Sequence, residues 1–141
     1  MERKTLNLEV ITPERMAFQD EADAVVLPGS EGELGILPNH APLLARLSVG
    51  ELRIRKGSET RLFAVSGGFA EVLSNRVKVF AETAEMEKEI SVERARLALE
   101  RAKKEITHSA SAEDLAQAQA ALMRALLRLR VAEGLHRRKQ K

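Results

Sequence analysis

The first part of the chain alternates between apolar and polar positions. Leu6, Leu8 and Val10 have polar or charged neighbours, and this period of two is typical of a half-buried strand. Further candidate strands follow at residues 24–27, 43–47, 52–55, 61–65, 69–73 and 77–81. Residues that favour turns, such as Gly29 and Gly57, separate them. Many short strands with regular turns predict a sandwich or a barrel.

The pattern changes near Glu85, where a period of three to four residues replaces the alternation. Between Glu85 and Gly134 there is no Pro or Gly, and good helix formers dominate. Two apolar stripes predict two helices. Their members are Val92, Ala95, Leu99, Ala102 and Ile106 in the first, and Leu115, Ala118, Leu122, Leu126 and Leu129 in the second.

Capping residues set the expected ends of these helices. Ser91 is a predicted N-cap for the first helix, and Ser111 with Asp114 resembles a capping box for the second. Gly134 is a predicted C-cap. The polar link at residues 107–112 is short, which favours an antiparallel hairpin.

The predicted second helix has more apolar surface than a hairpin needs. Met123, Leu127 and Val131 form a further ridge at four-residue steps. Two interpretations stay open: the ridge packs on the β-rich part, or it exchanges one burial partner for another.

Composition is that of a globular protein. The 141 residues are 44% hydrophobic and 31% charged, and no cysteine is present for a disulfide or a thiolate metal site. No apolar run approaches the roughly 20 residues that cross a bilayer, and the first residues lack the apolar segment of a signal peptide. We therefore expect a cytoplasmic protein, with attachment to a membrane complex left open.

Charge is distributed unevenly. Residues 1–86 have a net charge of −3 and residues 87–141 have +5, with one acid against seven bases after Asp114. A basic tail favours an anionic partner, either a phosphate ligand, a nucleic acid or an acidic protein. Four Phe and no Trp or Tyr give few rings for stacking bases, so nucleic acid is disfavoured.

Catalytic and metal-binding motifs are absent from the sequence. His40, His108 and His136 are far apart and lack the spacing of a helical metal site. Residues 29–35 are glycine-rich but lack the Gly-Lys-Ser/Thr of a phosphate-binding loop. The acids Asp20, Glu21 and Asp23 are most simply interpreted as a solvated turn. We expect no catalytic residue, no metal site and no required cofactor, hence a protein that is not an enzyme by itself.

Arginines on the predicted hairpin are better candidates for binding. Arg94 and Arg101 are seven residues apart, and Arg124 and Arg128 are four apart, so each pair lies on one helix face. Guanidinium groups from two helices could grip a triphosphate. The alternative is a solvated face paired with glutamates, and spacing favours that alternative.

Two longer motifs connect the chain to a known family. Residues 31–44, Glu-Gly-Glu-Leu-Gly-Ile-Leu-Pro-Asn-His-Ala-Pro-Leu-Leu, predict a shaped, irregular loop because of their glycines and prolines. Together with Ser-Gly-Gly-Phe-Ala-Glu-Val at 66–72, this stretch resembles the ε subunit of bacterial F-type ATP synthases. The likeness covers nearly the whole chain.

The resemblance implies an α+β fold that is mainly β in its N-terminal part: a rotor-binding β-sandwich at 1–86, followed by a regulatory antiparallel two-helix hairpin at 87–141. It implies a non-catalytic, peripheral subunit on the cytoplasmic face of the bacterial membrane. The sandwich would join the γ subunit to the ring of c subunits in the central stalk. By this resemblance Glu33 faces the c ring and His40 faces γ.

The resemblance also implies two roles for the hairpin. Some ε subunits bind ATP there, and the matching positions are Glu85, Arg94, Arg101, Arg124 and Arg128; Ser91 stands where the motif has Asp, which predicts weak ATP binding or none. The hairpin can open and inhibit ATP hydrolysis, and the expected contacts with the catalytic α and β subunits are Arg124, Arg128, Arg130, Arg137, Arg138 and Lys139. The alternative function is a stand-alone module whose basic hairpin binds an acidic protein or nucleic acid.

Overall fold

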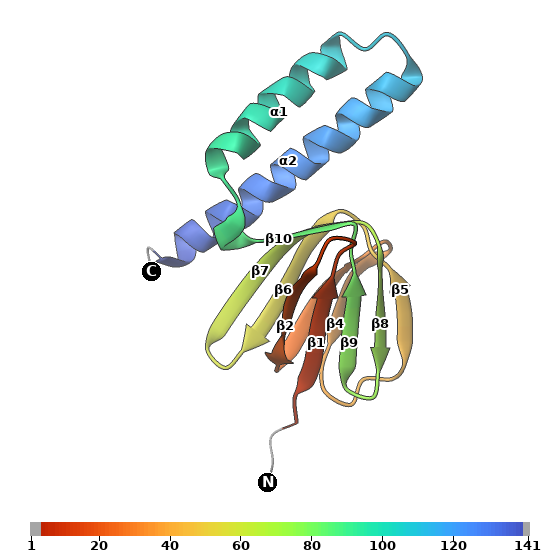
Figure 1. The fold of residues 1–141 in the computed structure, drawn as a ribbon, viewed down its shortest axis with the longest axis vertical. Coiled ribbons are helices and arrows are strands. Elements are labelled where there is room, and N and C mark those ends of the chain that lie inside the picture. Colours follow the sequence, from red (N-terminus) through yellow and green to blue (C-terminus); the bar gives the residue numbers. More distant parts are fainter. Residues whose placement is uncertain (1–3, 140–141) are drawn as a thin grey trace. The chain divides into compact units, whose positions relative to one another are not determined.

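A computed structural model describes residues 4–139, and for residues 135–139 it describes the backbone alone. The chain forms two compact units, Met1–Met86 and Glu87–Lys141. Strands make up the first unit and helices the second (Figure 1).

Two five-stranded sheets form the first unit. The first sheet has the order β2 (Met16–Ala22), β1 (Leu6–Ile11), β9 (Arg76–Phe80), β8 (Phe69–Leu73) and β5 (Leu43–Arg46). The second has the order β10 (Thr83–Met86), β7 (Glu59–Ser66), β6 (Gly50–Lys56), β3 (Ala24–Gly29) and β4 (Gly32–Ile36). Paired strands run antiparallel except β1 and β9, which are parallel. The predicted β-sandwich is confirmed.

The core of the sandwich comes from the alternating apolar positions. Leu6, Leu8 and Val10 of β1 are fully buried, and so are Val77 and Val79 of β9 beside them. Phe63, Leu52 and Val25 contribute the second sheet's part of the same cluster. Because successive side chains point to opposite faces of a strand, the intervening residues form the outer faces.

Strand β2 corrects one expectation. We interpreted Asp20, Glu21 and Asp23 as a solvated turn, but Asp20 and Glu21 lie in β2, and only Asp23 falls in the bend before β3. Lys56 Nζ donates to both carboxylate oxygens of Asp20 at 2.9 and 3.0 Å, which links β2 to β6 of the other sheet. The Phe18 ring contacts Phe63 edge-on at 5.4 Å between ring centres. These contacts between sheets outweigh the low strand propensity of the acids.

The structure of the glycine-rich stretch at residues 31–44 corrects a second expectation. Residues Gly32–Ile36 form β4, an edge strand paired with β3, instead of an irregular loop. A Cβ on Gly29 would approach the carbonyl oxygen of Gly32 to 2.6 Å, so the glycines allow a tight β3–β4 hairpin. The irregular part of the stretch is shorter and connects β4 to β5. Strand β10 was also not predicted. Beyond the end of β5, Leu47 pairs with Gly29 through an isolated bridge.

In the second unit, a short 3₁₀ helix η1 (Glu87–Glu89) precedes α1 (Val92–Thr107) and α2 (Ala112–Lys139). The two caps are confirmed: Ser91 Oγ accepts from the Arg94 amide at 3.3 Å, and Ser111 Oγ from the Asp114 amide at 3.0 Å. The predicted end at Gly134 is wrong, since α2 continues to Lys139. One glycine costs only about 1 kcal/mol in a helix interior, and the helix formers around it outweigh that.

Helices α1 and α2 contact each other along their length. Each helix has two buried alanines seven residues apart, Ala95 and Ala102 on α1 and Ala118 and Ala125 on α2. A spacing of seven residues returns to the same face after two turns. We call these four residues the alanine seam. Leu126, which we placed in the second stripe, is 48% exposed. Its neighbour Ala125 is buried in the seam instead.

The further ridge on α2 is not uniform. Met123 is 57% exposed, whereas Leu127 and Val131 are buried. Helix α2 also contacts η1 within this unit. Met123 is therefore the member of the ridge whose side chain stays open to a partner.

Candidate functional site

Glu33 lies on the edge strand β4, and its side chain is 71% exposed. Its Oε2 accepts from Arg53 Nη2 at 3.0 Å, across the intervening strand β3. Because both groups face water, this pair adds little to stability. Glu33 is free to exchange Arg53 for another partner.

His40 follows a tight turn in the connection between β4 and β5. The His40 amide donates to the Leu37 carbonyl at 3.2 Å, with Pro38 and Asn39 between them. Asn39 has a φ of 68°, and a Pro followed by a residue of positive φ is typical of a type II turn. His40 Nδ1 lies 2.7 Å from the Ala41 carbonyl, which can only accept, so Nδ1 carries the proton. The other ring nitrogen, Nε2, is left to accept a bond from a partner.

Three adjoining hollows begin at Glu33 and run along the surface. The first, of about 490 Å³, is lined by β4 residues with Leu44 and Arg46, and the second, of about 740 Å³, shares Leu44 and Arg46 with it. The third, of about 360 Å³, shares Gly68 and Phe69 with the second and ends at Ile11. The sandwich thus has one continuous surface from Glu33 to Ile11, which we call the hollowed surface.

Apolar side chains line the far part of the hollowed surface. Leu44 is 70% exposed and Phe69 is 47% exposed, and the Phe69 ring stacks on Phe80 with centres 5.0 Å apart. Adjoining exposed apolar side chains are candidates for a contact with another molecule. Sequence reasoning did not predict that Phe69 is exposed. Phe69 lies on the same face of its strand as the charged Glu71, and an apolar residue at such a position could have indicated an exposed aromatic ring.

The second motif, Ser66-Gly67-Gly68, has a structural role. It links β7 of the second sheet to β8 of the first, so the chain crosses between the sheets there. Gly67 and Gly68 have φ values of 68° and 102°, which favour glycine. Ser66 and Thr83 form a hydrogen bond between their hydroxyls, from β7 to β10. This crossover holds Phe69 at the start of β8.

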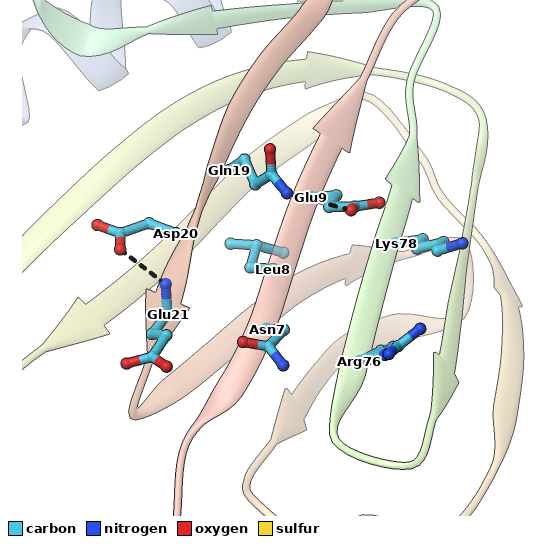
Figure 2. Close-up of a pocket in the computed structure, with 8 residues that line it drawn as sticks. All are labelled: Asn7, Leu8, Glu9, Gln19, Asp20, Glu21, Arg76 and Lys78. Atoms are coloured by element: carbon cyan, nitrogen blue, oxygen red, sulfur yellow. Dashed lines mark hydrogen bonds between the residues drawn. The ribbon is translucent and has the colours of Figure 1, made fainter.

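A polar pocket of about 410 Å³ lies on the outer face of the first sheet, over β2, β1 and β9 (Figure 2). Glu9 is the register partner of Lys78, and Asn7 is that of Arg76. Gln19 Nε2 donates to Glu9 Oε1 at 3.5 Å. The acids Glu9, Asp20 and Glu21 lie on β1 and β2, whereas the bases Arg76 and Lys78 lie on β9, so the pocket is not lined by charges of one sign.

The arginines predicted to bind ATP are placed on both helices of the hairpin. Arg94 and Arg101 are exposed on α1, Arg124 is exposed on α2, and Arg128 is half-buried. Glu85 lies on β10, in the first unit. The structure therefore brings the four arginines into one unit, and Glu85 belongs to the other.

Ser91 occupies the position of the motif aspartate. Its hydroxyl accepts the Arg94 amide as the N-cap of α1. A serine adds no negative charge here, and its oxygen already satisfies a helix amide. Where the resemblance implies a carboxylate for a nucleotide, this chain has a hydroxyl that caps α1.

The predicted inhibitory contacts extend along α2. Arg130 is exposed. Arg137, Arg138 and Lys139 belong to the last turns of α2, but their side chains lie outside the described residues. Within the described part of the chain, no group of three or more His, Cys, Asp or Glu could hold a metal ion. No helix among the described residues is long and apolar enough to span a membrane.

Known proteins resemble the chain over nearly all of its length. Residues 5–87 match the model of the β-sandwich domain of the ATP synthase delta/epsilon chain, and residues 88–133 match its long α-helix domain. The ATP synthase epsilon chain of Desulforamulus reducens is 47% identical over 92% of this chain and 98% of its own. That of Syntrophomonas wolfei is 48% identical over 94% of this chain and 98% of its own.

Solved structures show the same fold. A chain of the Euglena gracilis mitochondrial ATP synthase, in a structure of OSCP, F1 and c-ring, has a TM-score of 0.74 and 26% identity, covering 84% of this chain and 76% of that one. A chain from the Tetrahymena thermophila mitochondrial ATP synthase central stalk and c-ring has a TM-score of 0.61 at 17% identity, covering 94% and 99%. By its two domain matches and its relatives, the chain belongs to the ATP synthase delta/epsilon family.

Proposed function

We propose that this chain is the epsilon subunit of an F-type ATP synthase. It works without catalytic residues of its own: the sandwich attaches the γ subunit to the c ring, and the hairpin restrains ATP hydrolysis by the α and β subunits. The complex holds it at the cytoplasmic face of the bacterial membrane. Relatives named epsilon chain, at 45–48% identity, support the assignment.

The hollowed surface is the observation that supports attachment to the rotor. It is continuous from Glu33, the residue expected at the c ring, to the exposed Phe69 and the half-buried Phe80 on which it stacks. The charged end at Glu33 can contact a polar loop of a partner subunit. The apolar end can bury surface against a partner, and this burial stabilises the contact. We assign the apolar end to the γ subunit.

Copurification tests this assignment. Phe69→Ser in the full-length chain should reduce the amount of γ recovered with it severalfold or more, since truncated aromatic anchors cost about 2 kcal/mol or more. Leu97→Ser is the matched control, because Leu97 is 62% exposed but lies on α1. Equal recovery of γ with both variants would remove the apolar end from the interface.

Replacing Glu33 or His40 with tryptophan tests the charged end in the same way. Both side chains are at the surface and neither belongs to the core cluster, so the variants should fold. We expect Glu33→Trp to lose the c ring and His40→Trp to lose γ. Normal recovery of both partners would contradict these positions.

The alanine seam supports a hairpin that can open. Burying a methyl group contributes about 0.8 kcal/mol, against about 1.5–3 kcal/mol for a leucine side chain, so the alanine seam holds the helices less strongly than leucines at the same positions would. The basic residues of α2 could then move toward an acidic surface, and such attraction weakens with salt. No cofactor is required for this role, and ATP is at most a weak regulatory ligand.

A further inference from the structure

The turn before His40 is fastened to a distant part of the sandwich. The Asn39 amide donates to Asn75 Oδ1 at 2.6 Å, although the two residues are 36 positions apart. Asn75 Nδ2 lies 3.5 Å from Asn39 Oδ1, which also accepts from Lys4 Nζ at 3.5 Å. The hydrogen bond from the Asn39 backbone amide is the shortest of these three contacts and is therefore the strongest of them.

The donor is available because of the turn geometry. The turn's own hydrogen bond uses the His40 amide and the Leu37 carbonyl, so the Asn39 amide has no partner inside the turn. Asn75 Oδ1 supplies that partner. Without it, the Asn39 amide would depend on water, and besides its flanking strands the turn would keep only the long contact from Lys4 among those described.

The acceptor is fixed just as firmly. Ser74 and Asn75 have φ values of 49° and 61° and form the two-residue turn between β8 and β9, where Leu73 faces Arg76. Two successive positive φ values are typical of a type I′ turn. The Asn75 carbonyl accepts from the Asn7 amide at 2.8 Å, which anchors the turn to the start of β1. Asn75 therefore joins three chain segments through one residue.

We propose that Asn75 is a positioning residue for the rotor interface: it holds the Leu37–His40 turn so that the His40 ring faces γ in one orientation. This role rests on the proposed function, whereas the Asn39–Asn75 connection itself does not. The ring's own bond to the Ala41 carbonyl fixes its tautomer, and the bond from Asn39 to Asn75 fixes the backbone on which the ring stands.

Three variants of the full-length chain separate the side chain from the turn. Asn75→Gly removes Oδ1 but keeps a residue that type I′ turns favour at this position, so the chain should fold. Asn75→Asp keeps an acceptor oxygen. Asn39→Gly keeps the donating amide and tolerates positive φ, and is the matched control.

Two measurements are made on each variant: hydrogen exchange of the Asn39 amide in the isolated chain, and affinity for the purified γ subunit. We expect Asn75→Gly to speed the exchange roughly tenfold or more and to weaken γ binding roughly threefold to tenfold, as loss of one hydrogen bond would. Asn75→Asp and Asn39→Gly should stay within about twofold of the original chain, and all melting temperatures should agree within a few degrees.

Each of the other possible results would contradict one specific part of the proposal. Unchanged exchange in Asn75→Gly would show that the Asn39–Asn75 bond does not hold the turn. Faster exchange with unchanged γ binding would refute the positioning role. If the original chain itself fails to bind γ, the proposed function fails and takes the positioning role with it, while the exchange data still decide the connection.

Discussion

Gly68 lies directly against the carbonyl of Phe80: a side-chain carbon on Gly68 would overlap the Phe80 oxygen. Gly68 also has a φ of 102°, and its own carbonyl accepts from the Leu47 amide at 2.9 Å. The crossover from the second sheet to the first depends on this close approach. A glycine in the Ser-Gly-Gly motif is thus required by backbone geometry, and the exposed Phe69 beside it is positioned by the same contact.

Gly68→Ala should destabilise the sandwich strongly. The added carbon meets backbone that cannot move away cheaply, and the φ is strained, so we expect a loss of about 3 kcal/mol or more in the free energy of unfolding. Urea denaturation measures it. Gly35→Ala is the control, because an added carbon there meets nothing within 4 Å and should change stability by less than about 1 kcal/mol. A similar, small effect in both variants would be incompatible with the close approach.

Asp20 should make stability depend on pH. The Lys56 ammonium that donates to its carboxylate, helped by the Glu21 amide, lowers the pKa of Asp20. The ion pair therefore stabilises the fold above the unfolded pKa of about 3.9, and its contribution disappears as pH falls through the lower folded pKa.

We expect Asp20→Asn to lower the free energy of unfolding at pH 7 by up to about 1 kcal/mol, and the difference from the original chain to shrink as pH falls below the unfolded pKa of about 3.9. Glu59→Gln is the control, because the Glu59–Arg61 ion pair is longer, at 3.7 Å, and more exposed to solvent. Denaturation curves from pH 2 to pH 7 test this. A difference that stays constant as the pH falls would mean that the ion pair is not its cause.

Ala125→Leu should loosen the hairpin. Ala125 is 2% exposed in the alanine seam, and a larger side chain there forces the helices apart at a cost of about 1–3 kcal/mol. Leu126→Ala, one residue along and 48% exposed, should change stability by less than about 1 kcal/mol. Hydrogen exchange of the α1 amides measures both, and equal exchange in the two variants would argue against the seam.

ATP should bind weakly or not at all. Ser91 lacks the carboxylate of the motif, and its hydroxyl caps α1. Calorimetry of the isolated chain should detect no affinity in the micromolar range, whereas Ser91→Asp, which can also cap the helix, should bind more tightly. Micromolar binding by the unaltered chain would disprove this expectation.

Local patterns were sufficient for much of the fold. The strand at 69–73, both helix caps and the break between the helices follow from alternation and capping. Strands β2 and β4 were missed because their stability comes from partners distant in sequence, such as Lys56 for Asp20 and β3 for Gly32–Ile36. Leu126 was misplaced because a close-packed seam selects alanines over leucines.

The candidate site was only partly accessible to sequence reasoning. Glu33 and His40 came from a motif, and the hairpin arginines came from helical spacing. The link from Asn39 to Asn75 joins residues 36 positions apart, and nothing local in either turn indicates it. The hollowed surface likewise combines β4, β5 and β8, which only the folded sheets bring together.

Removing the residues from Ser111 onward in the assembled ATP synthase tests the account most directly. This truncation deletes α2 and leaves the sandwich intact, so ATP-driven proton pumping per ATP should be kept while the rate of ATP hydrolysis rises. An unchanged hydrolysis rate would contradict the restraining role of the hairpin, and a loss of pumping would contradict attachment through the sandwich alone.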